Sequence, residues 1–264
     1  MSLLEDGIAD VLGKAMRGLG KTAVRVCVEA GISQQMLQQL LDGGRDETAL
    51  LRVATVLGLD AEALIRLPDH FPELAQIEGV TRLSLPFRSW KVNAWLLETD
   101  GVRLLFDTGW NAHDIIEALD GALPDAVMIT HGHEDHVGGN ASIESMGIRI
   151  LSETEALERG RLDFGKIRIE VADLSGHCVP AASYLVSGFS KPLWVVGDAI
   201  FAGSMGGCKT PEQFILAKRT LRDGFDRMSA ETLILPGHGP MTSVADERVS
   251  NPFHPHFTSA KHLH

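Results

Sequence analysis

Three histidines and two carboxylates crowd residues 131–136, directly after the apolar stretch 126–130. Histidine is the commonest transition-metal ligand in proteins, because its neutral ring offers a nitrogen without adding charge. Residues two apart at the end of a strand point the same way, so His131 and His133 can bind one metal ion. Asp135 and His136, displaced around the following turn, can serve a second ion. The loop predicts a metal site, with a solvated surface loop as the alternative.

A pair of metal ions needs more ligands than one loop supplies, and three further candidates follow apolar stretches or small-residue turns. Asp198 ends the stretch 193–198, and a carboxylate there can bridge two cations because each oxygen can bind one. His238 lies in a Pro-Gly-His-Gly-Pro turn, where glycine and proline favour a tight backbone. His177 follows a turn of small residues, and an ordinary core or surface histidine is the alternative at that position.

These motifs follow one another in a fixed order, from the His-x-His-x-Asp-His loop to the Pro-Gly-His-Gly-Pro turn. Over residues 78–253 they resemble the metallo-β-lactamase fold, and most closely the hydrolases around glyoxalase II and their short bacterial relatives. The resemblance implies an α/β fold, a four-layer αβ/βα sandwich with a two-metal site on one rim. We therefore expect this fold over residues 76–264, preceded by a small all-α domain over residues 1–70.

The resemblance also implies a role for each candidate residue. The first metal would be held by His131, His133 and His177, the second by Asp135, His136 and His238, with Asp198 as the bridge. Asp107, in a Leu-Phe-Asp-Thr-Gly turn, would orient a ligand histidine. The expected cofactor is two divalent metal ions, with zinc expected first and iron or manganese as alternatives, since the same ligands accept all three.

The implied reaction is hydrolysis of a small-molecule thioester, lactone or related ester by a metal-bound hydroxide. Two dications lower the pKa of a shared water from 15.7 to about 7, and Asp135 would act as the catalytic residue that orients the hydroxide and accepts its proton. Two alternatives stay open. One is a mononuclear iron sulfur dioxygenase that uses His131, His133 and either Asp198 or His177; the other is a DNA-binding regulator whose metallo domain senses a ligand.

The substrate-binding residues are unknown from the sequence. The hydrolases of the glyoxalase II type carry a C-terminal helical domain that helps to bind glutathione, and only 26 residues follow His238, so we expect no complete glutathione pocket. Substrate contacts could come from Trp90, Trp110, Asn111, Phe201 and Met205, with ordinary packing as the alternative for each. Cys178, next to His177, is expected to be a packed thiol rather than a ligand or nucleophile.

Alternating and short apolar runs after residue 76 predict the strands that must position these side chains. The expected strands are 80–87, 92–99, 102–106, 126–130, 148–151, 167–171, 183–186, 193–196 and 232–235, with helices at 114–119 and 211–228. Asp100-Gly101 predicts a hairpin turn between the second and third of these strands.

Apolar residues before residue 68 recur every three or four positions, which predicts four or five short helices over 8–67. The proline-containing segment 66–72 predicts a linker after them. Residues 22–67 resemble the Cro/repressor type of helix-turn-helix, with 33–41 as the recognition helix and four glutamines on its exposed face. Residues 1–70 carry seven Lys and Arg against ten Asp and Glu, which disfavours DNA binding. Dimerisation, or cover for the rim of the site, is the alternative role.

Composition narrows the class of protein further. The net charge is −11 and the pI about 5.4, which argues against a general binder of nucleic acid or anionic membranes. Three widely spaced cysteines suit neither a disulfide scaffold nor a zinc knuckle. We see no secretory signal and no apolar run long enough for a membrane helix. We therefore expect a soluble cytoplasmic protein without membrane association, with a homodimer as an open alternative.

Overall fold

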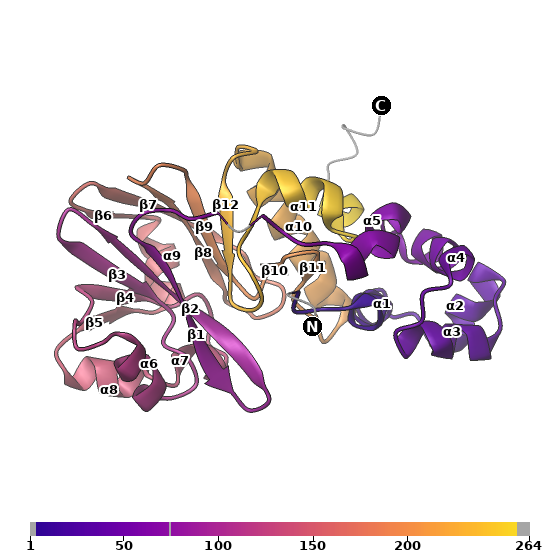
Figure 1. The fold of residues 1–264 in the computed structure, drawn as a ribbon, viewed down its shortest axis with the longest axis horizontal. Helices are drawn as coiled ribbons and strands as arrows, with labels where there is room; N and C mark the ends of the chain where they lie inside the picture. The colour runs from indigo at the N-terminus through magenta and orange to yellow at the C-terminus, as the bar shows by residue number, and fades with distance from the viewer. Residues whose placement is uncertain (1–3, 74, 258–264) are drawn as a thin grey trace.

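A computed structural model describes residues 4–73 and 75–257, and its larger part is built on two mixed sheets that face each other (Figure 1). The first sheet contains β1 (Val80–Phe87), β2 (Trp90–Thr99), β3 (Val102–Phe106), β4 (Ala126–Met128) and β5 (Arg149–Leu151), in that order. In the second sheet the order is β13-β12-β9-β8-β7-β6. Its strands are β6 (Arg161–Phe164), β7 (Ile167–Asp173), β8 (Ala182–Ser187), β9 (Leu193–Gly197), β12 (Leu233–Pro236) and β13 (Thr242–Ser243).

Both sheets are buried on their two faces, because helices cover the sides that face away from each other. Leu104 of β3 packs between the sheets, whereas the next residue, Leu105, packs outward. On β9, Val195 packs inward and Trp194 packs outward against the helical layer. Successive strand residues point to opposite faces, so uninterrupted apolar runs are typical of strands in such a layered core.

The outer layers complete a four-layer α/β sandwich, as predicted. Beside the first sheet lie α6 (Ala112–Ala118) and α8 (Asn140–Ser145), and beside the second lie α10 (Pro211–Arg227) and α11 (Val244–Ser250) (Figure 1). The remaining elements of this part are short: α7 (Glu134–Val137), α9 (Glu153–Arg159), α12 (His254–Phe257) and the hairpin of β10 (Ile200–Phe201) and β11 (Ser204–Met205). Among the described residues, no helix has both the length and the apolar character to cross a bilayer.

Five helices form the N-terminal region at the right of Figure 1, followed by a 3-10 turn, η1 (Leu67–Asp69). They are α1 (Ile8–Gly18), α2 (Ala23–Ala30), α3 (Gln34–Leu41), α4 (Glu47–Leu57) and α5 (Ala61–Arg66). Side-chain caps at Thr22, Ser33, Asp46 and Asp60 begin α2 to α5, because each accepts a hydrogen bond from a backbone N–H of the first turn.

The helical region shares one hydrophobic cluster with the outer face of the second sheet. Leu12 of α1 and Leu50 of α4 belong to the same buried cluster as Phe214 of α10 and Trp194 of β9. α2 and α3 lie where the helix-turn-helix was predicted, and the glutamines of α3 are exposed. DNA binding, which the charge of residues 1–70 disfavours, stays an untested alternative, and the division into two domains at residues 70 and 76 stays a prediction.

All nine predicted strands lie within two residues of their observed bounds. Asp100 and Gly101 have positive φ angles of 49° and 76° and join β2 to β3 as a two-residue turn, as the Asp-Gly pair predicted. The helices α7, α8, α9, α11 and α12, the strand β6 and the two-residue strands were not predicted. The predicted linker includes η1, which is helical because α5 continues directly into it.

A buried acid fastens α11 to the β10–β11 hairpin. Glu247 has no solvent exposure, and its carboxylate accepts hydrogen bonds from Thr242 Oγ1 at 2.7 Å, Asn251 Nδ2 at 2.8 Å and Gly203 N at 3.0 Å. Burial raises the pKa of this carboxyl to about 7, although the three donors favour its charged form. The proton is therefore held more tightly in the folded chain than in the unfolded one.

We expect Glu247→Gln to remove a pH dependence of stability. A carboxyl whose pKa is raised on folding stabilises the fold fully below its unfolded value of 4.5, and this contribution is lost as the pH rises through about 7. Relative to the variant, the metal-free wild type should lose about 3 kcal/mol of unfolding free energy over this range. Urea unfolding at pH 4.5 and pH 8 measures the difference, and parallel curves would contradict it.

Candidate metal centre

The seven predicted ligand residues lie together at one rim of the sandwich. His131 follows β4, Asp198 follows β9 and His238 follows β12; β9 and β12 are parallel, so their carboxyl ends share an edge. His177 precedes β8, which is antiparallel to β9 and therefore starts at the same edge. The two sheets are joined here, because Ala182 N donates to Thr130 O at 2.7 Å and Tyr184 Oη donates to Ile129 O at 2.6 Å.

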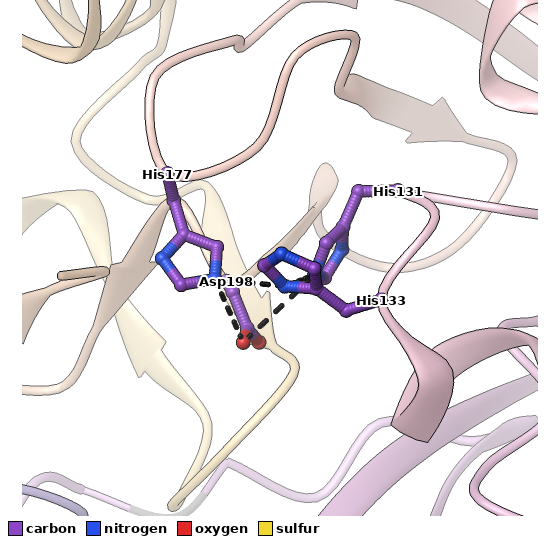
Figure 2. A group of neighbouring side chains, drawn as sticks. All are labelled: His131, His133, His177 and Asp198. Carbon is purple, nitrogen blue, oxygen red and sulfur yellow. Dashed lines mark hydrogen bonds and ion pairs between the residues drawn. The ribbon is translucent and has the colours of Figure 1, made fainter. Parts of the chain in front are cut away.

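The first group of donor atoms comes from His131, His133, His177 and Asp198 (Figure 2). His133 Nδ1 lies 3.1 Å from both His131 Nε2 and His177 Nε2. Asp198 Oδ2 lies 3.6 Å from His177 Nε2 and 3.9 Å from His131 Nε2. Four side chains from three separate loops therefore place their donor atoms around one point, as the ligands of a single metal ion do.

The second group is formed by Asp135, His136 and His238, and Asp198 joins it to the first. His238 Nε2 lies 3.3 Å from Asp135 Oδ2 and 3.5 Å from Asp198 Oδ2. His136 Nε2 lies 3.3 Å from Asp198 Oδ1. Because its carboxylate contacts histidines of both groups, Asp198 occupies the position that the bridging role requires.

Four of the five histidines are fixed through the ring nitrogen that faces away from the groups. His177 Nδ1 donates to Gly207 O and His238 Nδ1 donates to Lys91 O, each at 2.7 Å. His136 Nδ1 donates to Asp107 Oδ2 at 2.8 Å, and His131 Nδ1 lies 3.0 Å from Thr130 Oγ1. A proton on Nδ1 leaves Nε2 as an unprotonated electron-pair donor, which is the form that binds a metal ion.

Asp107 orients two of these histidines, one of them through Thr130. Its Oδ1 accepts from Thr130 N at 2.7 Å and its Oδ2 accepts from Thr130 Oγ1 at 2.8 Å. The Thr130 hydroxyl donates its proton to Asp107, so it can only accept a hydrogen bond from His131 Nδ1. The Asp107 carboxylate therefore sets the tautomer of both His131 and His136. This role of Thr130 was not predicted; its signal in the sequence is a hydroxyl residue directly before the first motif histidine.

The residues fit a pair of metal ions on two independent grounds. Ligand atoms about 2.0–2.1 Å from a tetrahedral ion are about 3.3 Å apart, and the donor separations above lie close to that value. In addition, His136 Nε2 and Asp198 Oδ1 are buried and have no hydrogen-bond partner among the described residues. Such atoms are costly in a folded protein unless they have a partner, and a cation placed between them would supply one.

The charges of the cluster favour a cation as well. Burial lowers the pKa of His131 well below its usual value. Burial opposes protonation of His136 and His238 too, but the Asp198 carboxylate raises their pKa to about 10 and about 11. Burial would raise the pKa of Asp198, yet the positive charges of His136 and His238 hold it well below its usual range. Positive charge is thus stabilised at this point, whether protons or metal ions carry it.

Gly237 permits the close approach of the two groups. A Cβ atom at this position would lie 2.2 Å from Asp198 Oδ1 and 2.7 Å from His136 Cε1, which is closer than van der Waals contact allows. The glycine of the Pro-Gly-His turn therefore makes room for the carboxylate that joins the two groups.

The structure separates the residues that were candidates for substrate contact. Asn111 caps α6 and Met205 is buried in the core, so both are packed residues. Trp90 is 60% exposed at the β1–β2 turn, and Trp110 packs against Phe87 with ring centroids 5.0 Å apart. Phe201 is buried with its ring centroid 5.8 Å from that of His238. Cys178 is half-buried and belongs to neither donor group among the described residues.

Comparisons with known proteins agree with this architecture. The family model described as the metallo-beta-lactamase superfamily matches residues 88–145, which include the 131–136 loop. The chain is 26% identical over 204 residues to the probable metallo-hydrolase YqgX of Bacillus subtilis (strain 168), covering 64% of this chain and 95% of YqgX. The BLEG-1 B3 metallo-beta-lactamase crystal structure superposes with a TM-score of 0.53 at 21% identity, covering 66% of this chain and 99% of that chain.

A further similarity covers a shorter part of the chain. Hydroxyacylglutathione hydrolase of Serratia proteamaculans (strain 568) is 32% identical over 126 residues, which are 42% of this chain. The match spans 48% of that enzyme, about half its length. Together with the sheet order and the site, these comparisons show that the chain has the metallo-beta-lactamase superfamily fold, with an N-terminal helical region and a cluster of His and Asp side chains suited to divalent metal ions.

Proposed function

We propose that this protein is a hydrolase that depends on two divalent metal ions and cleaves a small-molecule thioester, lactone or related ester. One observation carries the proposal: Asp198 lies within 4.0 Å of ring nitrogens of four histidines that belong to two adjoining donor groups. Such a shared carboxylate is what two neighbouring cations require. The names of YqgX and of the hydroxyacylglutathione hydrolases support hydrolysis as the reaction class.

His131, His133 and His177 would hold one ion, Asp135, His136 and His238 the other, and Asp198 both. Two bound dications would supply Lewis acidity, lower the pKa of water at the site to about 7 and polarise the scissile carbonyl. Zinc is the proposed ion, and iron and manganese suit the same donors.

The protein's own groups then position the reactants. His133 and His177 are the more exposed members of the first group, so substrate would approach from their side. The Asp135 carboxylate, buried against His238, would orient the attacking water and accept its proton at a carboxylate oxygen. Phe201, edge-on to His238, would exclude bulk water from the second group.

The experiment compares metal-free, zinc-loaded and iron-loaded protein on a panel of small thioesters, lactones and esters. We expect hydrolysis with metal and only the background rate without it. Hydrolysis by the metal-free protein as fast as by the loaded one would refute the proposal. One iron per chain with oxygen consumption would replace it by the sulfur dioxygenase alternative.

A further inference from the structure

Lys14, in the N-terminal helical region, contacts the β10–β11 hairpin, which lies directly after Asp198 in the chain. Lys14 of α1 is ion-paired with Asp6, and its side chain is only 13% exposed. Its ammonium donates a hydrogen bond to Met205 O at 2.9 Å, across 191 residues of sequence, and lies 4.9 Å from the ring centroid of Phe201. A long cationic side chain is thus fixed on both strands of the β10–β11 hairpin.

The residues after Met205 touch the first donor group directly. Gly206 N donates to Ala199 O at 3.2 Å, and a Cβ at Gly206 would lie 1.9 Å from Asp198 O and 3.0 Å from His177 Cβ. The carbonyl of Gly207 accepts the hydrogen bond from His177 Nδ1. The backbone at 205–207 therefore sets the orientation of the His177 ring, and it packs against the backbone of Asp198.

The hairpin is held from two sides. At its turn, Gly203 N donates to Glu247 and Ser204 O accepts from Asn251 Nδ2 at 2.9 Å, so α11 and the residue that caps its end hold one end of the hairpin. At the other end, Met205 O accepts from Lys14 Nζ at 2.9 Å and, at the longer distance of 3.5 Å, from Ser204 Oγ. Loss of the Lys14 contact would loosen the 205–207 backbone, which the hydrogen bond from Gly206 N to Ala199 O still holds, and would leave the turn in place.

We infer that Lys14 is a positioning residue for the proposed metal centre. It fixes the carbonyl of Met205, and through the next two residues the carbonyl of Gly207, so that His177 Nε2 faces His133 and Asp198. The N-terminal helices would then be part of the centre's support rather than an independent attachment. This role rests on the proposed metal site, and it adds a residue that none of the motifs contains.

The chain offers a matched control. Lys21 is also ion-paired with a carboxylate, that of Glu29, and also donates to a backbone carbonyl, Val56 O at 3.1 Å. Its side chain is 19% exposed, close to the value for Lys14, but its contacts lie within the helical region. Lys14→Met and Lys21→Met remove the same kind of interaction at two places, and Lys14→Arg keeps the charge and donors.

Two readouts that do not depend on substrate test the role. Zinc titration should show about tenfold weaker binding in Lys14→Met, the lower end of the effect of groups that orient ligands, and unchanged binding in Lys21→Met and Lys14→Arg. In the metal-free protein, hydrogen exchange at Gly206 N should be at least about tenfold faster in Lys14→Met alone. The reason is that the carbonyl of Met205, the residue before Gly206, has lost its hydrogen bond from Lys14.

Three outcomes would refute the positioning role of Lys14. Equal zinc affinity and equal exchange in Lys14→Met and Lys21→Met would overturn the role of Lys14 and leave the hydrolase proposal standing. Failure of the wild-type protein to bind metal would remove the metal site itself, and the role of Lys14 with it. A Lys14→Met protein that does not fold, beside a folded Lys21→Met protein, would make Lys14 a general stabilising residue and also refute the role.

Discussion

Asp198→Asn is expected to lower the rate of metal-dependent hydrolysis by about a thousandfold or more, the loss that follows when roughly 4 kcal/mol of transition-state stabilisation is removed. The amide is nearly the same size but carries no negative charge, and its NH2 group cannot donate electrons to a cation. Because the carboxylate contacts histidines of both donor groups, metal content should fall at both positions. Initial rates and elemental analysis on the same samples measure the two effects.

A histidine titration of the metal-free variant gives a check without substrate. The carboxylate of Asp198 raises the pKa of His136 and His238, so its removal should lower both. Asp125→Asn is a control, since Asp125 accepts from Arg103 N at an exposed position away from both groups. Wild-type activity in Asp198→Asn would show that the two groups do not share this carboxylate.

Asp107→Asn should weaken metal binding by about 10–100-fold, although Asp107 belongs to neither group of donor atoms. Asp107 Oδ2 accepts hydrogen bonds from both His136 Nδ1 and Thr130 Oγ1. An amide NH2 group at this position is itself a donor, so it could not accept either hydrogen bond. His136 would then favour the tautomer with the proton on Nε2, the atom that must bind the ion. The backbone is not the cause, because asparagine tolerates the φ of 63° at this position.

Zinc competition with a chelator measures this effect, and nitrogen-15 shifts of the metal-free protein report the pKa of His136, which loss of the Asp107 charge should lower. Asp125→Asn again removes a carboxylate that accepts from a backbone N–H, without touching a histidine. If Asp107→Asn binds zinc as tightly as the wild type, with the pKa of His136 unchanged, the orienting role of Asp107 is wrong.

Local signals predicted the individual strands, whereas the four-layer arrangement was implied by the resemblance of the motifs to the metallo-β-lactamase fold. Apolar stretches such as 193–196 are buried on both faces, and only strands between layers have that environment. The Asp-Gly pair fixed its turn through the backbone conformations that these two residues adopt easily. The short helices α7 to α9 were missed because four to seven residues carry too little periodicity to separate a helix from a loop.

The site was predictable to the extent that its side chains lie in motifs. The carbonyls of Gly207 and Lys91 that orient His177 and His238 could not be found, since any residue type supplies a carbonyl. Lys14 could not be found either, because its contact with Met205 depends on how α1 packs against the β10–β11 hairpin. Such contacts between distant segments come from tertiary packing, which no spacing along the chain encodes.

The number of metal ions held by each chain can be measured in protein purified without chelator and then equilibrated with zinc. We expect two ions per chain in the wild type and one in a His136→Ala, His238→Ala double variant, which keeps the first donor group intact. A wild-type chain that retains no ion, or a double variant that still retains two, would show that the two donor groups do not hold a pair of ions.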